Sequence, residues 1–123
     1  MKLSNMEIYG HAQSLNSLFG PTCELKLPVK VNFFLQKNIK ILLEAAQDIE
    51  TNRLLIAKNY GKLNEDGTAY SIDPANTELV NKELANLFEI KQEVTIHMFK
   101  LEDFDGLEFT FAQMNALMFM IEE

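Results

Sequence analysis

The chain has 123 residues, a formal net charge of −7 and 47% apolar residues, nine of them Phe. Its length and apolar content suit one globular core, so we expect residues 1–123 to form a single domain and not to stay disordered. The negative charge disfavours direct binding to nucleic acid, whose phosphates most of the surface would repel. The longest apolar run, Ala116 to Ile121, is too short to cross a membrane.

Cysteine usage and the N-terminus indicate the compartment. Cys23 is the single cysteine, so it cannot form an intramolecular disulfide. The first residues lack the basic and apolar regions of a secretory signal. We therefore expect the protein in a reducing cytoplasm.

The first predicted helix begins after Ser4, because Ser4 and Glu7 have the spacing of a capping box, and it ends before Pro21. Gly10 lies inside it at a cost of about 1 kcal/mol relative to Ala, which calls for tertiary support or close packing. Apolar and polar residues then alternate over residues 23–27, which predicts a short strand.

A long helix is predicted from Pro28, which suits a first helical turn, to the residue before Gly61. An apolar seam with heptad-like spacing follows it: Leu35, Ile39, Leu42, Ala46, Ile49, Ile56 and Tyr60. Further apolar residues widen this surface: Phe33, Phe34, Ile41, Leu43, Leu54 and Leu55. More than one neighbouring element must therefore cover the helix. Arg53 interrupts the seam, so it must reach water, pair with Glu78 or Glu83 of a packed helix, or hold a carboxylate of a partner.

A turn at residues 64–67 and a short strand near residues 70–72 should follow. Asp73 can cap, and Pro74 can open, a helix that folds back antiparallel on the long one. Over residues 93–99 the apolar period changes to two, which predicts a strand that pairs with residues 23–27.

Thr110 and Gln113 repeat the capping-box spacing ahead of a final helix, after a turn at Asp105-Gly106. The elements together predict a mainly α fold of the α+β class. It should contain a long helical hairpin, flanking N- and C-terminal helices and a small two- or three-stranded antiparallel β element.

No set of residues in the sequence predicts catalysis, a metal site or a cofactor. His11 and His97 lie outside any nucleophile motif, and one Cys with two distant His does not make a zinc site. Residues 62–73 have partial calcium-loop spacing, but Lys62 stands at the first ligand position and would repel the cation. We therefore expect no enzyme; a small-ligand pocket would have to use Tyr9, His11, Arg53 and Tyr60.

The C-terminal run from Leu117 to Ile121 is apolar on every side of a helical turn, so one covered face is not enough for it. Either it enters the domain's own core or it completes an interface, for which Met side chains are well suited. The candidate interface residues are Arg53, Met114, Leu117, Met118, Phe119 and Met120.

Several short motifs together resemble a group of small bacteriophage and prophage proteins from low-GC Gram-positive bacteria. The first of these motifs are Tyr9, Leu15, Leu27-Pro28-Val29-Lys30, Lys37-Asn38, Arg53, Lys58 and Tyr60-Gly61. The C-terminal motifs are Phe109-Thr110-Phe111-Ala112-Gln113-Met114 and Ala116-Leu117-Met118. The resemblance implies expression inside an infected or lysogenic bacterium, and it supplies no catalytic residues.

The resulting hypothesis is a phage-encoded, non-enzymatic protein–protein interaction protein, with virion assembly as one role. It would act in the cytoplasm of the bacterial host or in association with the virion, and would bind itself as a homo-oligomer or another phage or host protein. Two alternatives stay open: an inhibitor of a host defence or transcription complex, and a small-ligand-binding protein.

Overall fold

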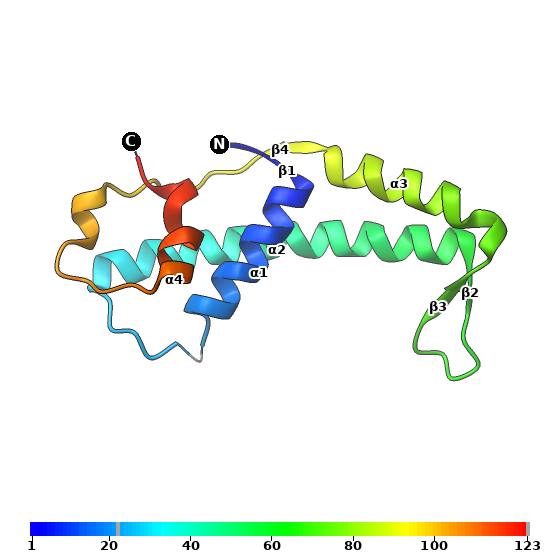
Figure 1. The fold of residues 1–123 in the computed structure, drawn as a ribbon, viewed down its shortest axis with the longest axis horizontal. Helices are drawn as coiled ribbons and strands as arrows, with labels where there is room; N and C mark the ends of the chain where they lie inside the picture. The colour runs from blue at the N-terminus through cyan, green and yellow to red at the C-terminus, as the bar shows by residue number, and fades with distance from the viewer. Residues whose placement is uncertain (22, 123) are drawn as a thin grey trace.

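The computed structural model describes residues 1–21 and 23–122, and helices dominate it. Helix α2 (Val29–Tyr60) is about 48 Å long at 1.5 Å per residue and forms the axis of the molecule (Figure 1). Helix α1 (Asn5–Phe19) crosses the middle of α2, and α3 (Thr77–Glu89) runs antiparallel to the second half of α2. The short helix α4 (Phe111–Leu117) packs against α1. The predicted class, with its long helical hairpin, is confirmed.

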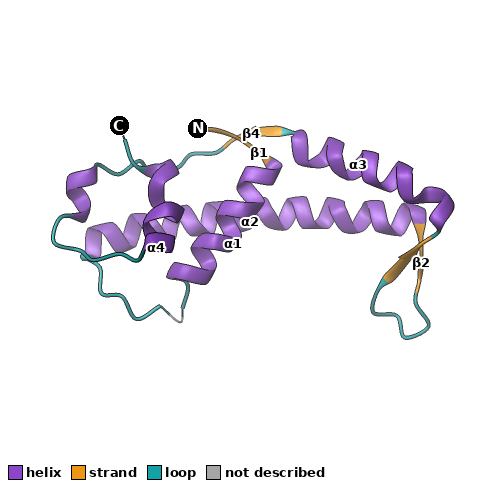
Figure 2. Ribbon diagram, in the orientation of Figure 1, coloured by secondary structure: helices purple, strands orange, loops and turns teal. Residues whose placement is uncertain are grey.

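The β structure consists of two small antiparallel sheets (Figure 2). Strand β1 (Lys2–Ser4) pairs with β4 (Lys91–Glu93), with Leu3 opposite Gln92. Strands β2 (Gly61–Leu63) and β3 (Tyr70–Ile72) form a hairpin beyond the end of α2. Three 3₁₀ turns complete the chain: η1 (Pro74–Asn76), η2 (Leu101–Phe104) and η3 (Met118–Met120).

Local sequence signals located the helix starts correctly. The side chain of Ser4 accepts a hydrogen bond from the Glu7 amide, and the Glu7 carboxylate accepts one from the Ser4 amide. Thr110 caps α4 by the same exchange, and Asp73 caps the turn that leads into α3. Each of these signals acts over two or three residues, which is why the sequence alone reveals it.

The predicted strand pairing between residues 23–27 and 93–99 is wrong. Residues 23–28 have no strand partner, although their apolar side chains pack partly against the core. Only the first residue of the second segment lies in β4, whose partner is β1 at the start of the chain. The extended chain that follows is held by the side chain of Asn38 and by a parallel bridge between Phe99 and Ile121. Residues 94–98 lie in no strand, so both the predicted strand and its predicted partner are wrong apart from Glu93 in β4 and the bridge at Phe99.

The core lies where α1 crosses α2. Its fully buried members include Ile8 and Leu15 of α1 and Leu35 and Leu42 of α2, together with Leu117 near the C-terminus. In the predicted seam of α2, Leu35, Ile39, Leu42 and Ile49 are buried, whereas Ala46 and the residues beyond Ile49 are only partly covered.

A slender arm extends from this core and consists of α2 from Glu50 onward, the β2–β3 hairpin and α3. All residues between Ile49 and Val80 are described, and none of them is buried. In this arm α2 and α3 cover each other on one side only, since α2 contacts α3 and the hairpin but no further helix lies along it (Figure 1). Among the described helices, none is both long enough and apolar enough to span a membrane.

Candidate functional site

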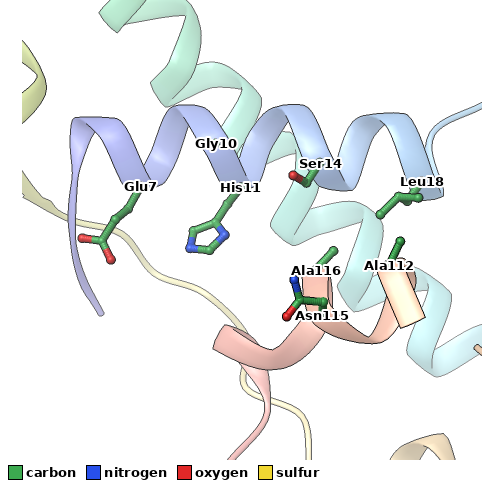
Figure 3. A pocket seen from close by; sticks show the side chains of 8 residues that line it. All are labelled: Glu7, Gly10, His11, Ser14, Leu18, Ala112, Asn115 and Ala116. Carbon is green, nitrogen blue, oxygen red and sulfur yellow. The ribbon is translucent and has the colours of Figure 1, made fainter. Parts of the chain in front are cut away.

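A groove with a volume of about 520 Å³ lies between α1 and α4 (Figure 3). Helix α1 contributes the polar side chains of Glu7, His11 and Ser14, and α4 contributes the amide of Asn115. The remaining wall is small or apolar: Gly10, Leu18, Ala112 and Ala116. These polar groups can exchange hydrogen bonds with a small polar molecule.

The imidazole of His11 is partly buried in this groove. Its ring stacks on Phe119, with ring centres 3.8 Å apart and planes inclined by 13°. Burial lowers the pKa of His11 below its usual 6.5, and the neighbouring Glu7 carboxylate opposes that shift only partly. His11 is therefore mainly neutral at pH 7 and ties α1 to the C-terminal turn η3.

Glu7 takes part in the capping box at the start of α1. Its hydrogen bonds with the amide and hydroxyl of Ser4 lower its pKa, so it stays ionised as the cap of α1. The hydroxyl of Ser14 lines the groove without a hydrogen bond to His11 among the bonds of the described residues. The groove is suited to holding a small polar molecule.

The four residues predicted to line a ligand pocket do not meet at one place. Tyr9 and Arg53 come together on Glu50, where the Tyr9 hydroxyl donates over 3.4 Å. His11 lies in the α1–α4 groove, and Tyr60 ends α2 at the far end of the arm. Tyr9 and His11 are separated by two positions on α1 and so point to different faces.

The predicted pairing of Arg53 with Glu78 or Glu83 is wrong. Its guanidinium binds the carboxylate of Glu50 in a bidentate manner, with N–O distances of 2.9 and 2.6 Å. The partner lies one turn earlier on the same helix, so the pair needs no contact between separate elements. The hydrogen bond lowers the pKa of Glu50 and raises that of Arg53. The side chain of Arg53 is 42% exposed, so the ion pair lies at a partly exposed position on the surface.

The predicted C-terminal interface divides into buried and open residues. Leu117 and Met120 are completely buried within the subunit, which excludes them as contact residues in this conformation. Met114 and Phe119 are partly covered. Met118 is 59% exposed and alone among these apolar residues points mainly to solvent.

Sequence analysis missed a second groove, which lies on the arm between α2 and α3. Its volume is about 430 Å³, and Leu55 and Ile90 form its apolar edges while remaining 51% and 52% exposed. Its other lining residues are Asn52, Ile56, Asn59, Glu83, Asn86 and Leu87. The surplus of apolar residues on α2, Leu55 among them, was the available signal, but the sequence could not show which of them would stay uncovered.

The residues with calcium-loop spacing include a hydrogen-bonded turn. The calcium-like spacing falls on the β2–β3 hairpin, where the Asp66 carboxylate accepts hydrogen bonds from the amide and hydroxyl of Thr68. These bonds lower the pKa of Asp66 and hold the turn at Gly67, whose φ of 73° suits glycine. Within the described residues, no group of three or more His, Cys, Asp or Glu side chains could hold a metal ion.

Comparison of the chain with protein-family models, with curated proteins and with solved structures gave no match.

Proposed function

We propose that this protein is a non-enzymatic protein–protein interaction protein whose arm binds another protein. One observation carries the proposal: large apolar side chains stay about half exposed along helices that cover each other on one side only. Leu54, Leu55, Leu79 and Ile90 are 47%, 51%, 50% and 52% exposed. Exposed apolar surface grouped on one element is a common property of contact sites between proteins.

The groove between α2 and α3 supports a protein as the ligand. Leu55 and Ile90 can anchor apolar side chains of a partner, while Asn52, Asn59 and Asn86 offer amides that both donate and accept hydrogen bonds. An apolar centre with a polar rim is the usual composition of such an interface. A preformed helical surface also loses less conformational entropy on binding than a disordered segment would.

The resemblance to phage proteins suggests the setting. We propose action in an infected or lysogenic bacterial cell, on virion assembly, with inhibition of a host defence or transcription complex as the alternative. A phage structural protein as partner would favour assembly. A host complex as partner would favour inhibition.

The test uses Leu55→Glu and Ile90→Glu, single substitutions at half-exposed positions that should leave the fold intact. Met6→Glu is the matched control, because Met6 is 64% exposed, lies on α1 and does not line the groove. Proteins captured from infected cells by the tagged chain should be retained by Met6→Glu and lost from both arm variants. If the arm variants, folded by circular dichroism, capture the same proteins as the wild type, the arm is not the contact surface.

A second candidate, a small-ligand-binding protein, rests on the α1–α4 groove with His11, Ser14 and Asn115. A polar metabolite that binds there should raise the melting temperature of the wild type but not of an Asn115→Leu variant. No shift with any polar metabolite in a broad screen would remove this candidate.

A further inference from the structure

The first half of α2 presents a basic and apolar face in an otherwise acidic protein. Lys30, Phe33, Lys37 and Lys40 follow one another at helical spacings of three and four residues and are all exposed. Val29 and Phe33 are 87% and 61% exposed. No carboxylate occurs on α2 before Glu44. We name residues 29–40 on this exposed side the basic face.

Within the described residues, the lysines of the basic face form no ion pair with a carboxylate. The ion pairs of the described part of the chain join Met1 to Glu93 and Arg53 to Glu50, so Lys30, Lys37 and Lys40 take part in none. Burial of the exposed Phe33 would stabilise a complex, and the lysines beside it would attract carboxylates. A surface that is both acidic and apolar would therefore complement the basic face.

Such a surface exists on this chain, over residues 101–111. This acidic segment contains Glu102, Asp103, Asp105 and Glu108 and no cation, although Lys100 precedes it. Its ends carry Leu101, 60% exposed, and Phe111, the most exposed of the large apolar side chains at 89%. Phe104 is buried, so the segment is anchored to the core while its charged and apolar groups face outward.

Both surfaces lie at the same end of the molecule. The acidic segment contains η2, which lies at the same end of the molecule as the start of α2, opposite the arm (Figure 1). Two surfaces at one end of a molecule can be matched reciprocally by one twofold axis, with each contact occurring twice. A nucleic acid would bind only the basic face, and its phosphates would be repelled by the adjacent acidic segment and by the net charge of −7.

We propose that two copies of this chain associate through this end, with the basic face of each copy against the acidic segment of the other. The inference goes beyond the proposed function, because self-association uses the end of the molecule opposite the arm. A dimer of this kind would present its two arms outward.

The test compares two charge-reversed proteins by light scattering over a range of concentrations. Lys30→Glu with Lys37→Glu, and Glu102→Lys with Asp105→Lys, should each weaken the dimer at least tenfold, because like charges then face each other at both contacts. An equimolar mixture of the two should regain the dimer, since both contacts are again complementary. The control Lys58→Glu with Lys62→Glu makes the same charge change on the arm and should dimerise like the wild type.

Three results would overturn the proposal: a wild type that stays monomeric at its highest attainable concentration, a mixture that does not regain the dimer, or a dimer unaffected by the reversals. Binding of a labelled oligonucleotide that is lost from the Lys30/Lys37 variant would assign the basic face to nucleic acid instead. The arm variants Leu55→Glu and Ile90→Glu should leave the dimer intact, so failure here is distinguishable from failure of the arm proposal.

Discussion

Replacing Asn38 by Ala should destabilise the protein more than the loss of a polar side chain from a helix normally does. Asn38 is 1% exposed on α2, and its amide pairs with the backbone of His97 in both directions. Its Nδ2 donates to the His97 carbonyl and its Oδ1 accepts from the His97 amide, each over 2.9 Å. The side chain of Asn38 therefore supplies the His97 backbone with the two hydrogen bonds that a neighbouring strand would otherwise provide.

The expected magnitude follows from the two backbone groups left without a partner. Each unsatisfied buried group costs about 1–3 kcal/mol, and partial access of water to His97 favours the lower part of that range. We therefore expect Asn38→Ala to lower the free energy of unfolding by roughly 2–4 kcal/mol. For a chain of this size that corresponds to a melting temperature lower by roughly 6–20 °C.

Urea and thermal unfolding followed by circular dichroism would measure this effect. Asn52→Ala is the control, because Asn52 lies on the same helix but is exposed and bonds only to the Asp48 carbonyl one turn earlier. Its effect should stay within about 0.5 kcal/mol. Hydrogen exchange at the His97 amide adds a local measurement, which should show protection in the wild type and its loss in Asn38→Ala. Equal stability of the two variants would refute the bridge between α2 and the extended chain.

Three further predictions concern α1 and the C-terminus. Gly10→Ala should raise the free energy of unfolding by about 0.5–1 kcal/mol in thermal melts, because a Cβ there would meet no atom within 4 Å and Ala is the better helix former; a loss of stability would show hidden close packing. The folded-state pKa of His11 lies below the usual 6.5, so its stabilising contribution is complete above pH 6.5 and falls as the pH drops through the folded value. Urea unfolding at pH 7.5 and 5.5 should show this loss in the wild type but not in His11→Gln. Leu117→Ala should lower the free energy of unfolding by about 2–5 kcal/mol, because Leu117 is buried, and Met118→Ala, at an exposed position, by under about 0.5 kcal/mol. Equal losses for the two variants in urea titrations would contradict this difference in burial.

The sequence predicted those features of the fold that arise from neighbours along the chain. Capping at Ser4 and Thr110, the capped turn η1 after Asp73 and the glycine turns at Gly67 and Gly106 each depend on residues no more than three positions apart. The long helix was equally accessible, because its apolar seam repeats over many turns and no Gly or Pro interrupts it.

Pairings between distant residues could not be predicted in this way. Strand β1 pairs with β4 across most of the chain, and both strands are only three residues long, too short for a period of two to be recognised. Asn38 stands on a helix and would ordinarily be assigned to the surface, yet it is one of the most buried side chains. A single sequence contains no sign that its amide meets a backbone 59 positions away.

The C-terminal run shows how a change of helix type decides which residues are open. At the 3.6-residue period of an α-helix, an apolar run such as 117–121 points in all directions, so the sequence left its burial undecided. The chain changes to a 3₁₀ turn at Met118, and at three residues per turn Leu117 and Met120 lie on the same side. That side is the core, where both are completely buried, while Met118 is turned to solvent. Within this run, Met118 is therefore the residue most available to a partner.

The arm shows the opposite situation, in which the apolar surplus of α2 stays uncovered. Helix α2 continues past Ile49 for about 16 Å, where only α3 and the hairpin accompany it. Two helices packed on one side cannot bury enough surface to hold each other firmly, so the base of α3 needs an attachment to the core. Asn5 supplies it: its amide and backbone bind the carbonyls of Leu87 and Ile90, each over 2.8 Å, at the point where α3 ends. This buried asparagine therefore fixes the direction of α3, and the exposed groove between α3 and α2 depends on it for its shape.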